Sequence, residues 1–305
     1  MNGPIQAEAC AKVIAYGEHF VLWGGLAVAL PLPGVKLRLT LTEGAPGIDV
    51  LEAAKAEKLL GKAFRLFGKR KVPEDFHVEC RSDFPPGEGL GGSAALCVAL
   101  TRLVGRYLEV PEDEDDVVQG ANELEKLFHG TPSGIDASTI GFQQPVYLQG
   151  ASVFDDTEPE PRAGFLDIPE GLPLLVACTG VKGDTGAAVK MVRDTASTER
   201  GSKMLAAFTG TALNVALQGA SALRSGAWRE AGMLFNDNHV LLAGLGLSCT
   251  EVERLRLAAL AAGAWGAKLT GGGIGGSVAV MAPPERLAAV RRALVAAGAT
   301  LVLKP

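Results

Sequence analysis

The stretch that decides the fold reads Pro85-Pro86-Gly87-Glu88-Gly89-Leu90-Gly91-Gly92-Ser93-Ala94-Ala95. Its four glycines let the backbone turn tightly and approach a ligand closely. A strand-like run at 76–80 leads into it, and a helix-prone apolar run at 94–103 leads out, so Ser93 lies where a helix begins. Free N–H groups and the positive end of a helix dipole would face the loop there, which is how a protein holds a polyphosphate. The stretch therefore predicts nucleotide chemistry.

Outward from this loop, the first half of the chain reads as strands with inserted helices. The pattern predicts strands over 11–15, 34–42 and 73–81, and helices over 50–67, 94–107 and 117–129. Alternating apolar residues from 35 to 41 carry the second of these strands. The acidic run at 111–116 fits a solvated helix start better than a binding site. The segment 155–162, rich in Pro and acids, reads as a loop or a boundary.

The second half is dominated by helices. They are expected over 185–195, 201–223, 228–243, 250–263 and 285–297, with strands over 174–179, 277–281 and 300–303. A second glycine cluster, 271–276, comes directly before the strand at 277–281. No repeat of fixed period is visible.

Composition narrows the function classes. A chain of 305 residues is long enough for one large domain or two ordinary ones. The formal net charge of -5 argues against a nucleic-acid partner. Five cysteines without a CxxC, and only four histidines, argue against a structural zinc site and favour free thiols in a reducing cytoplasm. No signal peptide and no membrane-spanning run is visible, so no membrane partner is expected.

Both glycine clusters fit G-x-G-x-x-G, at 87–92 and at 271–276, but that pattern alone is weak. A dinucleotide-binding domain would need an acid at the end of a second strand, and the acids at that distance fall in a polar run. Neither cluster has the Gly-Lys-Ser/Thr of a Walker loop, and the chain has no His-Arg-Asp or Asp-Phe-Gly. A strand follows the second cluster, so structural and functional interpretations of it stay open.

Four polar residues outside the loops are candidates for chemistry. Lys12 lies in a short apolar strand, where it must be paired, point into a polar site or reach solvent by its stem. Glu125 and His129 share one helix face, and Glu125 is either a Mg²⁺ ligand or an ordinary surface acid. A zinc pair of the two lacks a third ligand nearby in sequence. Asp136 lies in a segment bounded by Gly and Pro, where a lone Asp is usually a turn residue.

Taken together, these segments resemble the GHMP kinase superfamily, most closely its members that phosphorylate mevalonate. The matches run in the family's order from residue 10 to about 281. They comprise 11–14 with Gly17-Glu18-His19, 86–95, 125–136 with His129-Gly130-Thr131-Pro132-Ser133-Gly134-Ile135-Asp136, 235–239 with 241–242 and 245–248, and 268–277.

The resemblance implies an α/β (α+β) two-domain fold. Residues 1–165 would form a GHMP kinase N-terminal domain of the ribosomal-protein-S5-domain-2-like type, and 166–305 a ferredoxin-like α/β C-terminal domain. It also implies a cytoplasmic enzyme of isoprenoid biosynthesis that uses ATP and Mg²⁺. The enzyme would phosphorylate the C5 hydroxyl of mevalonate, giving 5-phosphomevalonate and ADP. The resemblance leaves open whether the protein forms a homodimer.

The resemblance also implies roles for the residues that match the family's motifs. Asp136 would be the catalytic base or would orient the hydroxyl, and Lys12 would contact Asp136 and the transferring phosphoryl group. Ser93 and Glu125 would hold Mg²⁺. ATP would be bound by Pro86, Gly87, Glu88, Gly89, Leu90, Gly91, Gly92, Ser93 and Ala94, and the substrate by Glu18, His19, Gly271, Gly272 and Gly273.

The chain departs from the family at several positions. Gly92 stands where the family has a second serine, the stretch 137–142 is shorter, and Gly272 and Ile274 replace Ala and Gly. Two alternatives therefore accompany the main prediction. One is a GHMP-type kinase for phosphomevalonate, a sugar or homoserine. The other is a non-catalytic ligand-binding protein of the same fold, against which the joint presence of Lys12, Ser93, Glu125 and Asp136 argues.

Overall fold

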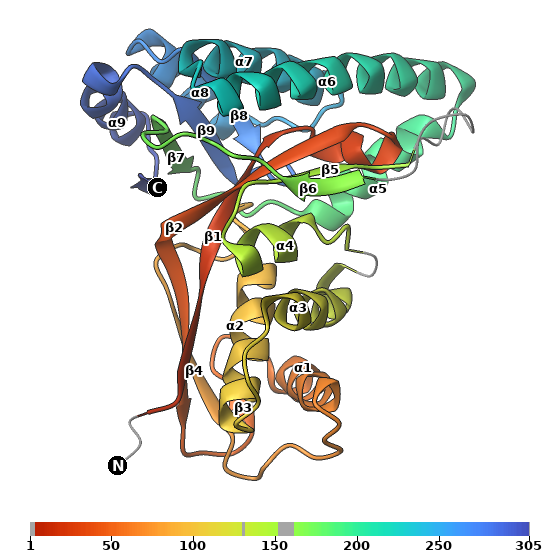
Figure 1. The fold of residues 1–305 in the computed structure, drawn as a ribbon. Helices are drawn as coiled ribbons and strands as arrows, with labels where there is room; N and C mark the ends of the chain where they lie inside the picture. Colours follow the sequence, from red (N-terminus) through yellow and green to blue (C-terminus); the bar gives the residue numbers. More distant parts are fainter. Residues whose placement is uncertain (1–3, 130–131, 152–161, 305) are drawn as a thin grey trace. The chain divides into compact units, whose positions relative to one another are not determined.

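A computed structural model describes residues 4–129, 132–151 and 162–304 (Figure 1). By packing, the chain forms two compact units that interleave along the sequence. The first unit comprises Met1–Lys12, Pro31–Pro85 and Gly91–Gln143, and the second comprises Val13–Leu30, Pro86–Leu90 and Gln144–Pro305. The division therefore runs through the first glycine loop, between Leu90 and Gly91. The predicted domain boundary after residue 165 stays a prediction.

Two long strands pass from one unit into the other. They are β1 (Gln6–Tyr16) and β2 (Leu26–Thr42), which pair with each other and are longer than the predicted 11–15 and 34–42. Within β2, residues 26–29 pair with β5 (Val146–Gln149) and residues 37–42 pair with β4 (His77–Ser82). Pro31 and Pro33 lie between these two stretches, where a missing N–H removes no bond from either ladder. Because of these two prolines, the sequence predicted a strand shorter than β2.

In the first unit, four helices lie on one side of a small sheet (Figure 1). β4 (His77–Ser82) runs antiparallel to β2, and β3 (Gly47–Ile48) runs parallel to β4. The helices are α1 (Ala53–Leu66), α2 (Gly92–Tyr107), α3 (Glu114–His129) and α4 (Ile135–Phe142). α2 is buried from Ala94 to Gly105 and packs against each of the other three, so it forms the centre of this unit.

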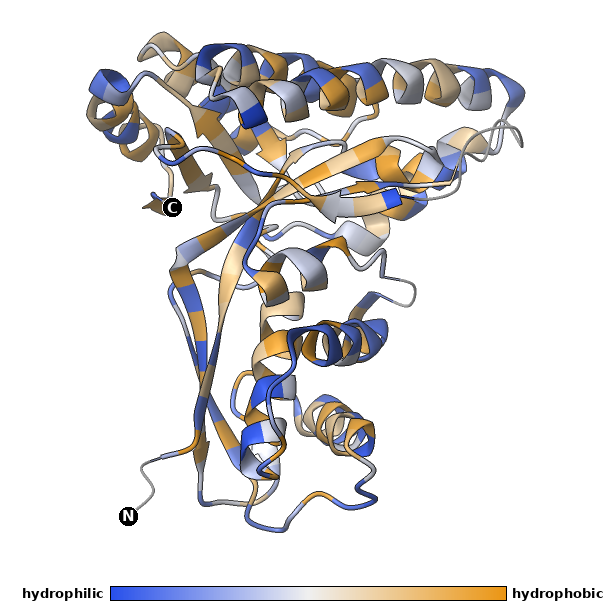
Figure 2. Ribbon diagram, viewed as in Figure 1, coloured by the Kyte–Doolittle hydropathy of each residue, from blue (hydrophilic) through white to orange (hydrophobic). Residues whose placement is uncertain are grey.

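Helix α1 shows why these segments are helical. Its buried residues are spaced at three and four positions and form one apolar stripe, which Figure 2 shows beside a hydrophilic face. They are Ala56, Leu59, Leu60, Ala63 and Phe64. The helix ends before Gly68, whose φ of 72° is the left-handed conformation typical of a helix C-terminus.

The second unit is built on an antiparallel sheet in the order β10-β7-β9-β8. Its strands are β7 (Leu174–Cys178), β8 (Gly266–Thr270), β9 (Ser277–Met281) and β10 (Leu301–Leu303). Every residue of β7, β8 and β9 is buried, so both faces of these strands are covered. The register places Val176 opposite Ala279, and Lys268 opposite the same Ala279 on the other side.

Helices cover one face of this sheet (Figure 1). α7 and α8 pack against β8 and β9, α9 packs against β7, and α6 lies along α7, whereas α5 packs against α6. Their bounds are α5 (Thr185–Ala196), α6 (Glu199–Ser225), α7 (Trp228–Gly244), α8 (Thr250–Ala261) and α9 (Leu287–Ala296), the last preceded by the 3₁₀ turn η2 (Pro284–Arg286). In the described part of the chain, no helix is long and apolar enough to cross a bilayer.

The predicted elements are present, although β1 and β2 begin well before their predicted starts, and six short elements of the described residues were missed. These are η1 (His19–Trp23), β3, α4, β5 (Val146–Gln149), β6 (Arg162–Phe165) and β8. Asp136 lies in the first turn of α4, so the usual place of a lone Asp in a turn does not apply to it. Gly134, with a left-handed φ of 84°, is the N-cap residue directly before this helix. Of the predicted loop at 155–162, residues 155–161 lie outside the described residues.

Candidate functional site

Lys12 and Asp136 form an ion pair in the first unit. Nζ of Lys12, on β1, is 3.0 Å from Oδ2 of Asp136, on α4. Lys12 is only 2% exposed, so its charge needs this partner. Of the alternatives that the sequence left open for Lys12, pairing is the correct one. The contact that the family resemblance implied is therefore present.

A second cluster in the same unit surrounds Ser93, the second residue of α2. Its Oγ lies 3.1 Å from Oε1 of Glu125 and 2.9 Å from Nε2 of His129, both on α3. Glu125 is 2% exposed, and its burial, with the nearby charge of Asp136, raises the pKa of its carboxyl to about 7. Burial also lowers the pKa of His129 below its ordinary value. The two predicted metal ligands, Ser93 and Glu125, are thus in contact.

The start of α2 is fixed by a close approach at Gly91. Its φ of 76° is left-handed, and a Cβ there would lie 2.9 Å from Cε and Cγ of Lys12 and 3.0 Å from Ile140 Cδ1. A glycine is required for both reasons. A Cβ on Gly92, by contrast, would meet only Phe84, at the ordinary distance of 3.7 Å. The serine missing at position 92 is therefore not excluded by lack of space.

The first half of the glycine loop belongs to the second unit and is bound to the segment between β7 and α5 and to the start of β9. Gly183 donates its N–H to the carbonyl of Gly87 at 2.9 Å, and Ser277 donates its hydroxyl to the carbonyl of Glu88 at 2.7 Å. The Glu88 side chain is buried, which raises its pKa, and it accepts the N–H of Gly180 at 3.0 Å. Glu88 thus holds the loop in place through its side chain.

The two glycine loops touch each other within the second unit. A Cβ on Gly271, at φ 89°, would lie 2.7 Å from Cα of Gly89, closer than real contacts allow. Gly272 packs in the same way against Thr185, the first residue of α5. Ile274 adopts a left-handed φ of 55° and donates its N–H to the carbonyl of Leu247 at 2.7 Å. The loop thus holds this conformation with Ile where the family favours Gly.

Glu18 and His19 lie at the start of η1 in the second unit. Glu18 pairs with Lys268 and accepts a bond from the Asn238 amide at 3.0 Å, so both of its oxygens are occupied. His19 donates from Nε2 to the carbonyl of Gly272 at 2.7 Å. Its burial lowers its pKa, and Nδ1 is buried without a partner among the described residues. His19 therefore has an acceptor atom without a partner among the described residues, whereas both carboxylate oxygens of Glu18 have one.

The C-terminal motif around Asn238 and His239 bonds to β8, to α8 and to the segment 17–18. His239 accepts the N–H of Leu269, on β8, at 3.2 Å and bonds to Glu253, on α8, at 2.7 Å. Asn238 accepts the N–H of Gly17 at 3.0 Å.

The sequence analysis did not single out Lys268. A lysine in an apolar strand needs a partner or a polar site, and this argument, used above for Lys12, holds equally for the run 266–270.

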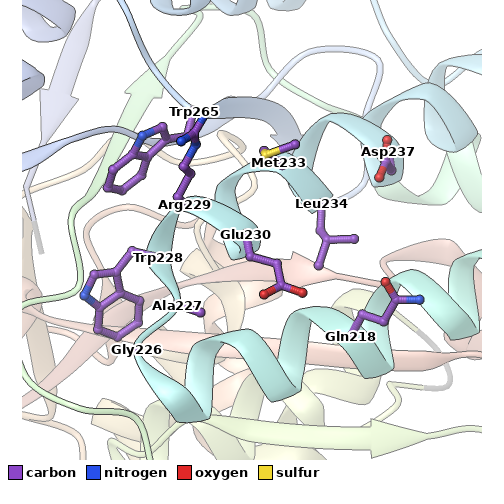
Figure 3. A pocket seen from close by; sticks show the side chains of 10 residues that line it. All are labelled: Gln218, Gly226, Ala227, Trp228, Arg229, Glu230, Met233, Leu234, Asp237 and Trp265. Atoms are coloured by element: carbon purple, nitrogen blue, oxygen red, sulfur yellow. The ribbon is translucent and has the colours of Figure 1, made fainter.

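A pocket of about 610 Å³ lies elsewhere in the second unit, between the turn that joins α6 to α7 and the start of β8 (Figure 3). Two tryptophans, Trp228 and Trp265, lie at one end, and Gln218 and Asp237 at the other. It is lined by Gln218, Gly226, Ala227, Trp228, Arg229, Glu230, Met233, Leu234, Asp237 and Trp265. None of these is a predicted site residue.

Comparison with known proteins identifies the family. The model of the GHMP kinases N-terminal domain matches residues 54–144, and that of the GHMP kinases C-terminal domain matches 220–300. A protein of Aeropyrum pernix named mevalonate kinase is 34% identical over 91% of this chain and 88% of its own length. The chain belongs to the GHMP kinase family.

A second relative and a solved structure are also similar to this chain. A mevalonate kinase of Thermococcus gammatolerans is 29% identical over 97% of this chain and 94% of its own. The crystal structure of L. major mevalonate kinase in complex with R-mevalonate superposes with a TM-score of 0.81 at 23% identity, covering 99% of this chain and 95% of that one. As a GHMP kinase, this chain uses ATP, and the predicted two-domain α/β fold is confirmed.

Proposed function

We propose that this GHMP kinase transfers the γ-phosphoryl group of ATP to the C5 hydroxyl of mevalonate, giving 5-phosphomevalonate and ADP. The name of the 34% identical relative supports this substrate. The observation that carries the reaction type is the Lys12–Asp136 ion pair, in the same unit as the contact of Ser93 with Glu125. Phosphoryl transfer needs positioned charge more than covalent chemistry, and these residues supply it.

Asp136 would accept the proton of the C5 hydroxyl, or orient it, as the hydroxyl oxygen bonds to phosphorus and the bond to the ADP oxygen breaks. A carboxylate held beside a lysine can take a proton late in a loose transition state. Lys12 would neutralise charge on the transferred group as well as on Asp136. The N–H groups at the start of α2 would bind phosphate oxygens.

The oxygen donors of the first unit fit Mg²⁺. A hydroxyl and a carboxylate are ligands that this cation prefers, and a carboxyl whose pKa is raised to about 7 gains from a cation beside it. In the described part of the chain, no three His, Cys, Asp or Glu side chains form a metal site, so ATP and water would supply the other ligands. Ser93 and Glu125 would hold the ion, which supplies charge neutralisation of the triphosphate when bound.

In the second unit, His19 and the loop residues Gly271, Gly272 and Gly273 would form the acceptor side. The unpartnered Nδ1 of His19 suits a hydroxyl donor of the substrate. The first glycine loop, from Pro86 to Ala94, would surround the triphosphate through its backbone.

An assay of ADP release with mevalonate, phosphomevalonate, homoserine and galactose tests the proposal. We expect kcat/KM for mevalonate to exceed the others by at least about a hundredfold, because an unpaired polar group in the acceptor site rejects a wrong substrate by this order or more. A preference for another acceptor would refute the substrate. Nucleotide binding without turnover of any of the four acceptors would favour a non-catalytic ligand-binding protein.

A further inference from the structure

The hydroxyl of Ser93 has two hydrogen-bond partners, and only one of them is a predicted metal ligand. Glu125 and His129 lie four residues apart on α3, so both face the start of α2. Their polar atoms approach Ser93 Oγ to 3.1 and 2.9 Å. Across residues 4–129, 132–151 and 162–304, the structure gives Oγ no third partner.

A serine hydroxyl has one hydrogen and two lone pairs. When the hydrogen points to Glu125, it occupies the space between the two oxygens that would share a cation. If Ser93 is to offer a lone pair to the same cation as Glu125, its hydrogen must turn to another acceptor. Nε2 of a neutral imidazole that carries its hydrogen on Nδ1 is such an acceptor, and it lies within bonding distance.

We propose that His129 is a positioning residue that accepts the Ser93 hydroxyl hydrogen and so directs the Ser93 oxygen toward the divalent cation that accompanies ATP. This inference rests on the proposed function, because it takes Ser93 and Glu125 as the groups that hold the cation. No covalent bond changes, and the hydroxyl keeps its hydrogen. Partners of this kind set the orientation of a metal ligand, and their loss typically costs about 10–100-fold in metal affinity or activity.

Two other roles for His129 make different predictions. As a metal ligand itself, His129 would bind the cation whether or not residue 93 carries a hydroxyl. As a purely structural contact between α2 and α3, it would affect folding but not the affinity for the cation in particular. A thermodynamic cycle between positions 93 and 129 separates the three roles.

The experiment measures binding of Mn²⁺ with a non-hydrolysable ATP analogue by electron paramagnetic resonance. The full-length chain would carry His129→Phe, His129→Gln, Ser93→Ala and the double change Ser93→Ala with His129→Phe. We expect His129→Phe to weaken Mn²⁺ binding about tenfold or more, because the ring remains but the acceptor is lost. His129→Gln should recover most of this, since its amide oxygen accepts a hydrogen bond. His77→Phe, on β4 of the same unit, is the matched control and should bind as the wild type does.

The decisive comparison is made in the Ser93→Ala background. There His129→Phe should change Mn²⁺ binding less than about twofold, because no hydroxyl remains to be oriented. Additive losses, or binding by His129→Phe that equals the wild type, would overturn the proposal. Since the measurement needs no acceptor substrate, a chain that shows the predicted cycle but does not phosphorylate mevalonate would refute the proposed function alone.

Discussion

Lys12 and Asp136 form an ion pair whose two ends differ in exposure. Their charged atoms are 3.0 Å apart, but the lysine side chain is 3% exposed and the aspartate side chain 30%. A buried ammonium that loses its partner remains an uncompensated charge away from water. A carboxylate at the edge of the protein that loses its partner is still solvated. Breaking the pair from either side should therefore have different effects on stability.

We expect Asp136→Asn to lower kcat at least about a hundredfold, because the group that accepts or orients the hydroxyl proton is lost. It should also destabilise the chain by about 2–4 kcal/mol, since Lys12 stays buried and charged. Lys12→Met should reduce activity similarly but cost less than about 1 kcal/mol, because it removes the buried charge itself. Steady-state kinetics and urea unfolding measure both quantities.

Asp115→Asn, at the exposed start of α3, serves as the control and should change neither quantity. ATP binding should survive in Asp136→Asn. Wild-type turnover in that variant would contradict the role of Asp136, and equal stability losses in the two variants would contradict the asymmetry of the pair.

Glu125 should make the metal-free protein less stable as the pH rises. Its pKa is about 7 in the folded chain against 4.5 for an ordinary glutamate. Below pH 4.5 both states hold the proton, and between 4.5 and about 7 the unfolded state loses it first, so stability falls. Above pH 7 the penalty is complete, on the order of 3 kcal/mol at most.

Glu125→Gln should therefore stabilise the protein at pH 8 in EDTA and flatten its unfolding free energy between pH 5 and 7. The measurement is urea unfolding across this range. Glu123→Gln, on the exposed side of the same helix, provides the comparison. A parallel pH profile for Glu125→Gln and the wild type would show that Glu125 ionises normally.

Glu18 and Lys268 form a buried pair in the second unit, with side chains 1% and 0% exposed. Removing one partner leaves the other charge buried, so Glu18→Gln should destabilise the chain by about 3–5 kcal/mol. The double change Glu18→Gln with Lys268→Met should recover at least half of that loss, which thermal and urea unfolding would show. Lys203→Met breaks an exposed pair with Glu199 and should cost less than about 0.5 kcal/mol. Additive losses from the two single changes would contradict the coupling.

The sequence identified most elements of the first unit and indicated that Lys12 needs a partner, because periodicity and a lysine in an apolar strand are local signals. Lys12 in an apolar strand implied a partner, and Asp136 was named as that partner through the family resemblance. The helix at 135–142 was missed since it is short and begins after Gly and Pro. The pairing of Glu18 with Lys268 joins residues 250 positions apart, and no periodicity reports such a contact.

The sequence patterns also did not predict that the two units interleave along the chain. Segments 13–30 and 86–90 join the second unit by strand pairing and by loop contacts such as Gly183 with Gly87. These contacts depend on tertiary packing, whereas sequence patterns report which face of an element is buried. The glycine loop itself was correctly interpreted as a tight turn before a helix, but its division between the units was not foreseen.

The neighbouring glycines 91 and 92 should respond oppositely to the same substitution. Gly91→Ser places a Cβ at a left-handed φ of 76° and 2.9 Å from Lys12, so it should displace the ion pair with Asp136. We expect at least a tenfold loss of kcat and a cost of about 2 kcal/mol. Gly92→Ser meets only Phe84, at 3.7 Å, and restores the serine that the family carries. It should keep activity within about threefold and stabilise the helix start by up to about 0.5–1 kcal/mol, since glycine in a helix is costly.

Each of these two variants is the control for the other, because the change in side chain is identical and the positions are adjacent. Kinetics with mevalonate and urea unfolding decide the outcome. Comparable losses in both would mean that the loop tolerates no side chain at all and that Gly92 is required for its shape. A loss confined to Gly91→Ser would show that the close approach to Lys12, and not the flexibility of the loop, is what the start of α2 demands.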